Sequence, residues 1–334
     1  MRNLTVRIPV LAVVGLGLVV TLAFTAPASL LPTLQFALIM GALAVSFQVV
    51  FGLLGELSLG HAALFGAGGY TYAVLTSAGT NWLVATLGAI ALGGIVAAVM
   101  ALLTFRLSGI YFSVVTFAFT MILAVIVRAN AQLGGTAGIP GVEGWPVIPD
   151  ILRFSTQTIY AGTIFVLLLV AYSLLKSSTP GVVLELARED RELALVSGVN
   201  VRRLRLVVTV VSGLMAGLVG AFFAQSTRFI SPDVFGFQYL IIPLSIVIVG
   251  GMRTRTGTVV GVLIVAVIPA FFNLSAVVDQ IVAGALLLLA ILVAPFGIVP
   301  EIAKLMRRMY PGKRATQPPT SDAPVPDAAK EAQK

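Results

Sequence analysis

The feature that most constrains this chain is a series of long apolar segments, separated by charges, prolines and glycine-rich breaks. A helix that crosses a bilayer needs about 20 mainly apolar residues. The 334-residue sequence can be cut into ten segments of roughly that length. They are approximately 8–24, 31–51, 57–77, 82–105, 109–128, 157–175, 206–227, 235–251, 257–273 and 279–298. The sequence therefore predicts an all-α, polytopic membrane protein with about ten transmembrane helices.

Composition agrees with this class. Apolar residues make up 58% of the chain and charged residues only 10%, whereas soluble domains are about 45–50% apolar. We expect a transmembrane domain over 1–300 and a cytoplasmic tail over 301–334, whose distal part is polar, rich in proline and disordered.

Two of the ten segments have a second interpretation. Four glycines make 57–77 a poor isolated helix, so it could be broken or re-entrant inside the bundle. The first segment follows Arg2 and Arg7 and precedes Ala26-Pro27-Ala28, a pattern that also fits a cleaved signal peptide. The length of its apolar run and the proline favour a retained helix.

The distribution of lysine and arginine predicts the orientation. With the N-terminus inside, 18 of the 21 basic residues face the cytoplasm, and only Arg128, Arg153 and Arg228 fall on the other side. Both termini and the loop 176–205 are then cytoplasmic, and the long loop 129–156 is external.

Several classes of function are disfavoured. The chain has no cysteine and one histidine, His61, so it offers no thiolate or multi-histidine metal site, and His61 itself is expected to pack or hydrogen-bond. Basic cytoplasmic loops explain the net charge of +8 without nucleic acid. The predicted spans carry no Asp, Glu, Lys or Arg well away from their ends, which argues against an ion-coupled carrier and an intramembrane enzyme. The sequence also contains no P-loop. If the chain takes part in ATP-driven transport, the ATP must be bound by another protein.

The loop 176–205 is a hydrophilic island with ten charged residues in thirty. Its apolar positions predict an amphipathic helix over 182–197, with Pro180-Gly181 as a turn before it and Gly198 as a C-cap. The island could be a docking element or simply a solvated loop with weak salt bridges. The residues that would make a docking contact are Arg188, Glu189, Asp190, Glu192, Ala194 and Gly198.

A resemblance favours docking. Glu192-x-Ala194-x-x-x-Gly198 resembles the EAA loop of ABC importer permeases, with Leu193 at the position of the first alanine. Four other stretches, in the same order as in the family, are similar to LivM-type permeases of branched-chain amino-acid importers. They are GELSLGHAALFGAGGY at 55–70, GIYFSVVTFAF at 109–119, GGTAGIPG at 134–141, and SPDVFGF at 231–237 followed by the glycine pair at 250–251.

The resemblance implies a bacterial inner-membrane protein with a bundle like that of type II ABC importers. The expected partners are a second, LivH-like permease that shares the substrate path, two cytoplasmic ATP-binding subunits and an external solute-binding protein. ATP and Mg would be bound by the ATP-binding subunits, and this chain would bind no cofactor and catalyse no reaction. The island would then be the coupling element.

Polar residues inside the spans are candidates for the substrate path. These are Gln48, Tyr111, Ser113, Thr116 and Thr120, with Gln35 and Ser46 as further possibilities. Ser113, Thr116 and Thr120 lie at three- and four-residue spacing and share a helix face. Their alternative role is hydrogen bonding between helices, and the small-residue face of Gly213, Gly217 and Gly220 is expected to pack closely against a neighbouring helix.

Glu56 stands where the family usually has glutamine. A pair between Glu56 and Arg106 could close an inner gate, or the carboxylate could simply be solvated at the interface. Other departures from the family are Met121, Ile242-Pro243 and the turn 252–258. They leave open a cargo of urea, short amides or aromatic acids in place of branched-chain amino acids.

Overall fold

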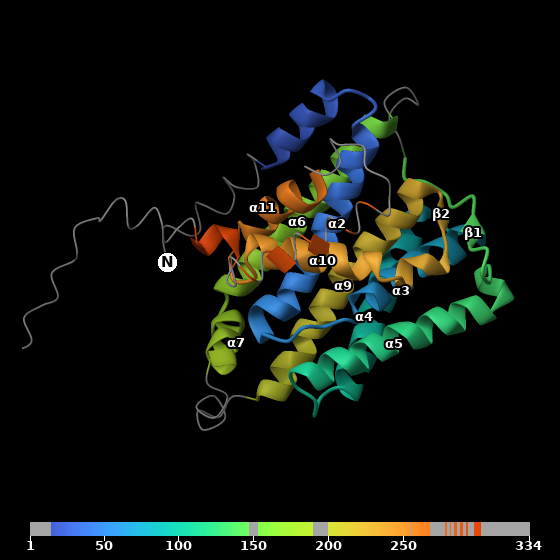
Figure 1. Cartoon of the computed structure of the whole chain (residues 1–334). Coiled ribbons are helices and arrows are strands. Elements are labelled where there is room, and N and C mark those ends of the chain that lie inside the picture. The colour runs from blue at the N-terminus through green and yellow to red at the C-terminus, as the bar shows by residue number, and fades with distance from the viewer. Residues whose placement is uncertain are drawn as a thin grey trace, which may run out of the picture.

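The computed structural model describes residues 15–146, 153–189, 200–254 and 256–267, together with 278, 281, 284–285, 288–289, 292 and 297–301. These residues form a bundle of helices with one short strand pair (Figure 1). The main helices are α2 (Leu31–Leu54), α3 (His61–Ser77), α4 (Trp82–Leu103), α5 (Ile110–Ala129), α6 (Arg153–Ser177), α7 (Thr179–Glu189), α9 (Val201–Thr227), α10 (Gln238–Gly250) and α11 (Gly257–Val262), which a π-helix, η4 (Leu263–Val267), continues. The predicted all-α class is confirmed apart from the strand pair.

Five of these helices are long and apolar enough to cross a membrane: α2, α4, α5, α6 from Phe154 onward, and α9. Three further apolar helices are shorter, at Gly15–Thr25, Gln238–Gly250 and Gly257–Val267. The chain is thus a polytopic membrane protein. Most of the tenth predicted span, 279–298, and the tail from 302 onward lie outside the described residues.

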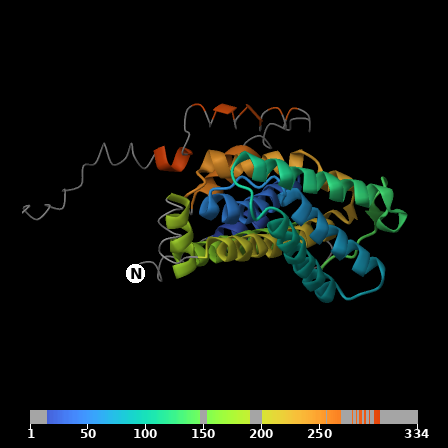
Figure 2. The same cartoon turned by 90° about the horizontal axis from the view of Figure 1, so that it is seen from below.

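Helix α2 occupies the middle of the bundle. It packs against α6, α9, α10 and α11, and nearly every residue from Ala37 to Val50 is buried. Helices α4 and α5 lie at the outside of the bundle, as Figure 2 shows from below. Many of their apolar side chains are exposed. Such faces suit contact with lipid or with another membrane subunit.

Helix α9 packs closely against α3 and α4 through small residues. A Cβ added at Gly217 would come within 2.6 Å of the carbonyl oxygen of Ala89, and one at Gly93 within 2.5 Å of that of Gly213. These approaches require glycine, as the small-residue face of α9 predicts.

One end of the bundle, the β end, consists of residues 131–146 and 228–236 and the adjoining helix ends. Here β1 (Ile139–Pro140) pairs antiparallel with β2 (Phe229–Ile230), between the short 3₁₀ helices η1 (Ala131–Leu133) and η3 (Pro232–Phe235). Gln157 and Gln225 exchange amide hydrogen bonds in the interior, at 2.8 and 3.3 Å. The Trp145 ring packs between neighbouring aromatic rings, those of Trp82, Tyr160 and Phe222.

The opposite end, the α7 end, consists of residues 51–60, 104–109, 176–189 and 251–254 and the start of α9 (Figure 1). The basic-residue bias predicts that these loops lie on one side of the membrane. The structure brings them into contact: Arg188 reaches the carbonyl of Gly52, Arg205 that of Leu107, and Lys176 that of Arg253.

The predicted starts of α7 and of α3 are wrong. Pro180 and Gly181 lie inside α7 rather than in a turn before it, because the first helical turn has free N–H groups and tolerates proline. The third segment becomes helical only at His61, not at 57. Gly55 ends α2 in the left-handed conformation (φ 74°), and the following backbone is bound by α5, as described below.

Candidate functional site

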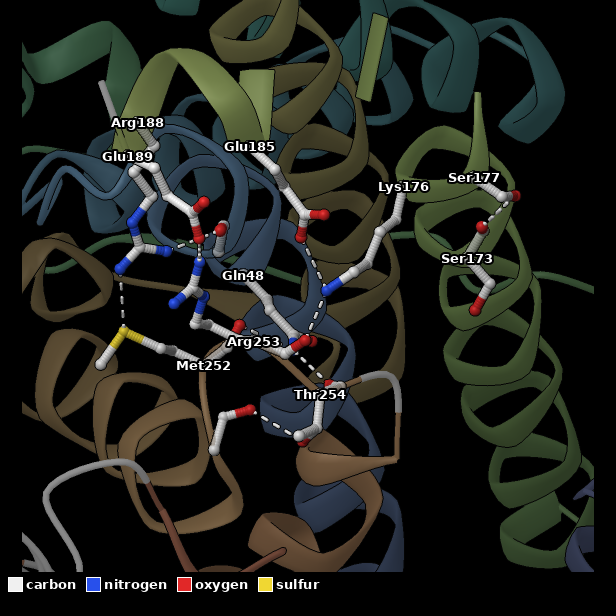
Figure 3. A network of polar contacts seen from close by, with 12 residues as sticks. Gln48, Ser173, Lys176, Ser177, Glu185, Arg188, Glu189, Met252, Arg253 and Thr254 are labelled. Carbon is white, nitrogen blue, oxygen red and sulfur yellow. Dashed lines mark hydrogen bonds and ion pairs between the residues drawn. The ribbon is translucent and has the colours of Figure 1, made fainter. Parts of the chain in front are cut away.

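Helix α7 is attached to its surroundings by ion pairs (Figure 3). Lys176 Nζ, near the end of α6, lies 2.9 Å from Glu185 of α7 and also donates to the carbonyl of Arg253. The Arg253 guanidinium in turn lies 2.6 Å from Glu189. Helix α6, helix α7 and the turn after α10 are therefore one electrostatic cluster.

Arg188 connects α7 to the end of α2. Its Nη1 donates to the carbonyl of Gly52 at 2.8 Å, and its Nη2 lies 3.5 Å from Met252 Sδ. The last carbonyls of a helix lack partners and carry partial negative charge, so a guanidinium suits this position. Burial lowers the pKa of Arg188, and the nearby Arg253 lowers it further. At Gly55 a Cβ would lie only 2.5 Å from Arg188 Nε, so the contact needs glycine there.

Gln48 holds the turn 252–254 from the bundle side. This fully buried side chain donates through Nε2 to the carbonyls of Thr254 at 2.8 Å and Met252 at 3.3 Å. Its Oε1 accepts a hydrogen bond from Thr258 Oγ1. The turn is thus bound by α2 on one side and by α7 on the other, as Figure 3 shows. This is the same turn in which the sequence departs from the family.

The junction between α2 and α3, residues 55–60, is not helical and is held by hydroxyls of α5. Ser113 Oγ donates to the carbonyl of Leu57 at 2.6 Å, and Thr120 Oγ1 to that of Leu59 at 3.2 Å. Thr116 Oγ1 accepts the N–H of Leu59 at 3.0 Å. The shared face that the spacing predicts is present, and its hydroxyls bind backbone of the junction.

A buried ion pair holds the same junction from α9. Arg205 and Glu56 lie 2.5 Å apart, with side chains 9% and 16% exposed. Arg205 also donates to the carbonyl of Leu107 at 2.7 Å and lies over the Phe112 ring, 4.7 Å from its centroid. An ion pair this deep is costly to break, because the remaining charge stays buried.

The predicted partner of Glu56, Arg106, is therefore wrong. The Arg106 guanidinium lies over the ring of Phe105, 5.0 Å from its centroid. Arg205 was missed because it was counted among the basic residues of the cytoplasmic loop, just before the predicted span at 206, whereas α9 turns it inward. Helical spacing extended back from 206 would have shown that Arg205 shares the buried face of Val208, Thr209 and Ser212.

The other predicted site residues fall in different places. Tyr111 is 72% exposed, away from the face that carries Ser113. Arg188 and Glu189 make the contacts given above, whereas Asp190, Glu192, Ala194 and Gly198 lie outside the described residues.

His61 is hydrogen-bonded in the interior, as expected. Its Nε2 lies 2.7 Å from Ser212 Oγ and its Nδ1 3.3 Å from the carbonyl of Ser58. Ser212 Oγ also lies 2.8 Å from the carbonyl of Ser46. His61 thus connects α3, α9 and the junction. In the part of the chain that the structure covers, no three His, Asp or Glu side chains gather to hold a metal ion.

The apolar helices define a multi-pass membrane protein. At the α7 end, charged contacts hold the short helix α7, which lies outside the spans, against the bundle. Residues 29–291 match the family described as branched-chain amino acid transport system / permease component, and the chain belongs to this family. It is therefore a transport component and not an enzyme.

Individual relatives agree with the family. The high-affinity branched-chain amino acid transport system permease protein LivM of Escherichia coli K12 is 27% identical over 288 residues, covering 77% of this chain and 67% of the relative. LivM of Salmonella typhimurium matches to the same extent. The permease protein LivH of Salmonella typhimurium is 31% identical over 121 residues, 35% of this chain and 39% of LivH. No solved structure matches the chain significantly.

Proposed function

We propose that this chain is the LivM-like permease subunit of an ATP-driven importer for branched-chain or related amino acids, and that α7 passes the force of ATP hydrolysis into the bundle. One observation carries the second part. Helix α7 is tied to three separate segments through Arg188, Glu189 and Glu185. A helix held in this way can move the ends of α2, α6 and α10 together.

The α7 end faces the cytoplasm in this proposal, with both termini, in a bacterial plasma membrane. The support is that loops assigned to the cytoplasm by their basic residues contact one another at one end of the bundle. About ten spans in an arrangement like that of type II importers complete the domain 1–300, with 301–334 as a cytoplasmic tail.

The partners follow from this role. The path is shared with a LivH-like permease, ATP and Mg are bound by two cytoplasmic subunits, and an external binding protein delivers the cargo. The exposed apolar faces of α4 and α5 supply surface for lipid and for the second permease. The contact with the ATP-binding subunit is made by the α7 region, including Asp190, Glu192, Ala194 and Gly198.

The path residues divide into two groups. Ser113, Thr116 and Thr120 bind the junction, and Gln48 binds the turn 252–254, so these four act on the path by holding its walls. Tyr111 is exposed on α5 and is the candidate to face the path at the boundary with the second permease.

The departures from the family do not by themselves decide the cargo. Met121 is 36% exposed and lies on the outside of α5. The turn 252–258 is held by hydrogen bonds from Gln48 of α2 and from Arg188 of α7. Urea, short amides and aromatic acids remain the alternative cargo.

Uptake by the reconstituted complex tests the proposal. The permease pair, the ATP-binding subunits and the binding protein are placed in proteoliposomes, and labelled leucine uptake is measured with ATP inside, with and without ionophores. We expect uptake that requires ATP, survives loss of ion gradients and is competed by isoleucine and valine. Uptake driven by a gradient without ATP would refute the importer class, and a complex that carries labelled urea or benzoate but no leucine would refute the cargo.

A further inference from the structure

The chain on either side of residues 190–199 is fixed to the same short segment. Arg188, one residue before the end of α7, donates to the carbonyl of Gly52. Arg205, in the second turn of α9, pairs with Glu56. The two arginines are 17 residues apart in sequence, and the residues they hold are four apart. A displacement of α7 relative to α9 would therefore pull Gly52 and Glu56 in different directions, and these residues flank the start of the junction.

The junction is suited to move as a unit. Residues 55–60 are not helical and lack the repeated backbone hydrogen bonds of a helix. The carbonyls of Leu57 and Leu59 are instead bound by side-chain hydroxyls of α5. Non-helical backbone at membrane depth is tolerated where protein buries it or where it lines a water-filled path. Side-chain contacts of this kind can exchange for water without unfolding α2 or α3.

Two of the six junction residues are also tightly packed in this structure. Ser58 and Gly60 are buried, and the space beside Gly60 is filled by Met100 and Thr116. The junction is therefore packed against α4 and α5 at the α7 end.

We propose that residues 55–60 are the inner closure of the transport path, and that Arg188 and Arg205 are positioning residues that open it when α7 moves. This rests on the permease role proposed above. It keeps the inner gate that the sequence suggested at Glu56, replaces Arg106 by Arg205 as the partner, and extends the gate to the whole junction. The ion pair of Glu56 with Arg205 is the latch: while it is made, the junction stays packed on α5.

Thiol labelling tests this directly, because the natural chain has no cysteine. In the complete reconstituted complex, Ser58→Cys carries the only thiol of this subunit, and the partners are made cysteine-free. A polar maleimide is added on the side of the ATP-binding subunits, without nucleotide and after trapping with ATP and vanadate. We expect the labelling rate of this introduced thiol to differ by about tenfold or more between the two states. Ala73→Cys, equally buried in α3 away from the junction, is the matched control and should stay protected in both.

The latch is tested in the same assay. In the Ser58→Cys background, Arg205→Gln should expose the introduced thiol to labelling in both states and remove most of the nucleotide dependence. The exchanged pair Glu56→Arg with Arg205→Glu should restore part of that dependence. Arg203→Gln, an exposed neighbour on α9, should leave labelling unchanged.

The outcomes separate the two proposals. A Ser58→Cys complex that imports substrate with ATP while its introduced thiol stays protected in every state overturns the inner closure and leaves the permease role intact. A wild-type complex that shows no ATP-driven uptake overturns the permease role and the closure with it.

Discussion

The two ends of the bundle are built from different interactions. At the α7 end, ion pairs and a guanidinium join segments that are far apart in sequence: Lys176 with Glu185, Arg253 with Glu189, Arg205 with Glu56, and Arg188 with the end of α2. At the β end, the corresponding connections are a backbone ladder, a pair of glutamine amides and aromatic packing. The exposed pair of Arg253 and Glu189 can exchange its contact for water or for a partner's charges, whereas buried aromatic packing cannot. In the proposed role, the α7 end is the one that changes during transport.

The largest expected effect is on the buried pair at the α7 end. Arg205→Gln leaves the Glu56 carboxylate buried without its cation, which should lower the free energy of unfolding by about 3–5 kcal/mol. The loss should appear as a lower Tm of the purified subunit. Glu56→Gln, which keeps an uncharged acceptor, should cost less. Equal Tm values for Arg205→Gln and the exposed control Arg203→Gln would contradict the burial of this pair.

The next effect concerns Gln48. Gln48→Leu leaves the carbonyls of Met252 and Thr254 and the hydroxyl of Thr258 without this partner, and we expect roughly 3 kcal/mol of destabilisation. The rate of amide hydrogen exchange in residues 252–258 should rise, because the turn loses its hydrogen bonds to α2. Gln35→Leu, earlier on the same helix, is the control. Unchanged exchange in Gln48→Leu would show that α7 alone holds the turn.

A variant at the β end sharpens the contrast. Gln225→Leu removes the partner of the Gln157 amide and of the backbone N–H of Trp145, and should cost about 2 kcal/mol. Because this pair lies far from α7, the ratio of substrate uptake to ATP hydrolysis in the folded fraction should stay at the wild-type value. If this ratio falls as much as in α7-end variants, the two ends do not differ in role.

The smallest effect is expected for the exposed pair. Arg253 and Glu189 side chains are 47% and 62% exposed, and such pairs contribute about 0–1 kcal/mol and are screened by salt. Arg253→Gln should change Tm little, and the small change should vanish at high salt. A loss that persists in high salt would mean that Arg253 acts through packing.

The sequence predicted those parts of the fold that depend on local composition. Helices α4 and α5 match the segments 82–105 and 109–128 within two residues, because their apolar runs end at clear breaks. The late start of α3 was not predictable, since the backbone of 57–59 is satisfied by α5 hydroxyls more than fifty residues away. The β1–β2 ladder joins two residues with two others about ninety positions later, which leaves no local signal.

For the candidate site, the sequence singled out several of the residues but not the partners that they contact. The charged island drew attention to Arg188 and Glu189, and the structure adds their partners in α2 and the turn 252–254. Glu56 was singled out by its departure from the family, but its partner depended on where α9 begins. Contacts of this kind follow from the packing of helices, which spacing within one segment does not determine.

The most direct test of the role of α7 compares the coupling of transport to ATP hydrolysis in Arg188→Gln and Gln225→Leu. Both variants are assembled with the second permease, the ATP-binding subunits and the binding protein, and uptake and ATP hydrolysis are measured in the same proteoliposomes. We predict that Arg188→Gln hydrolyses ATP but loses about tenfold or more in substrate carried per ATP, while Gln225→Leu keeps the wild-type ratio. A wild-type ratio in Arg188→Gln would contradict the claim that α7 acts on the bundle through this arginine.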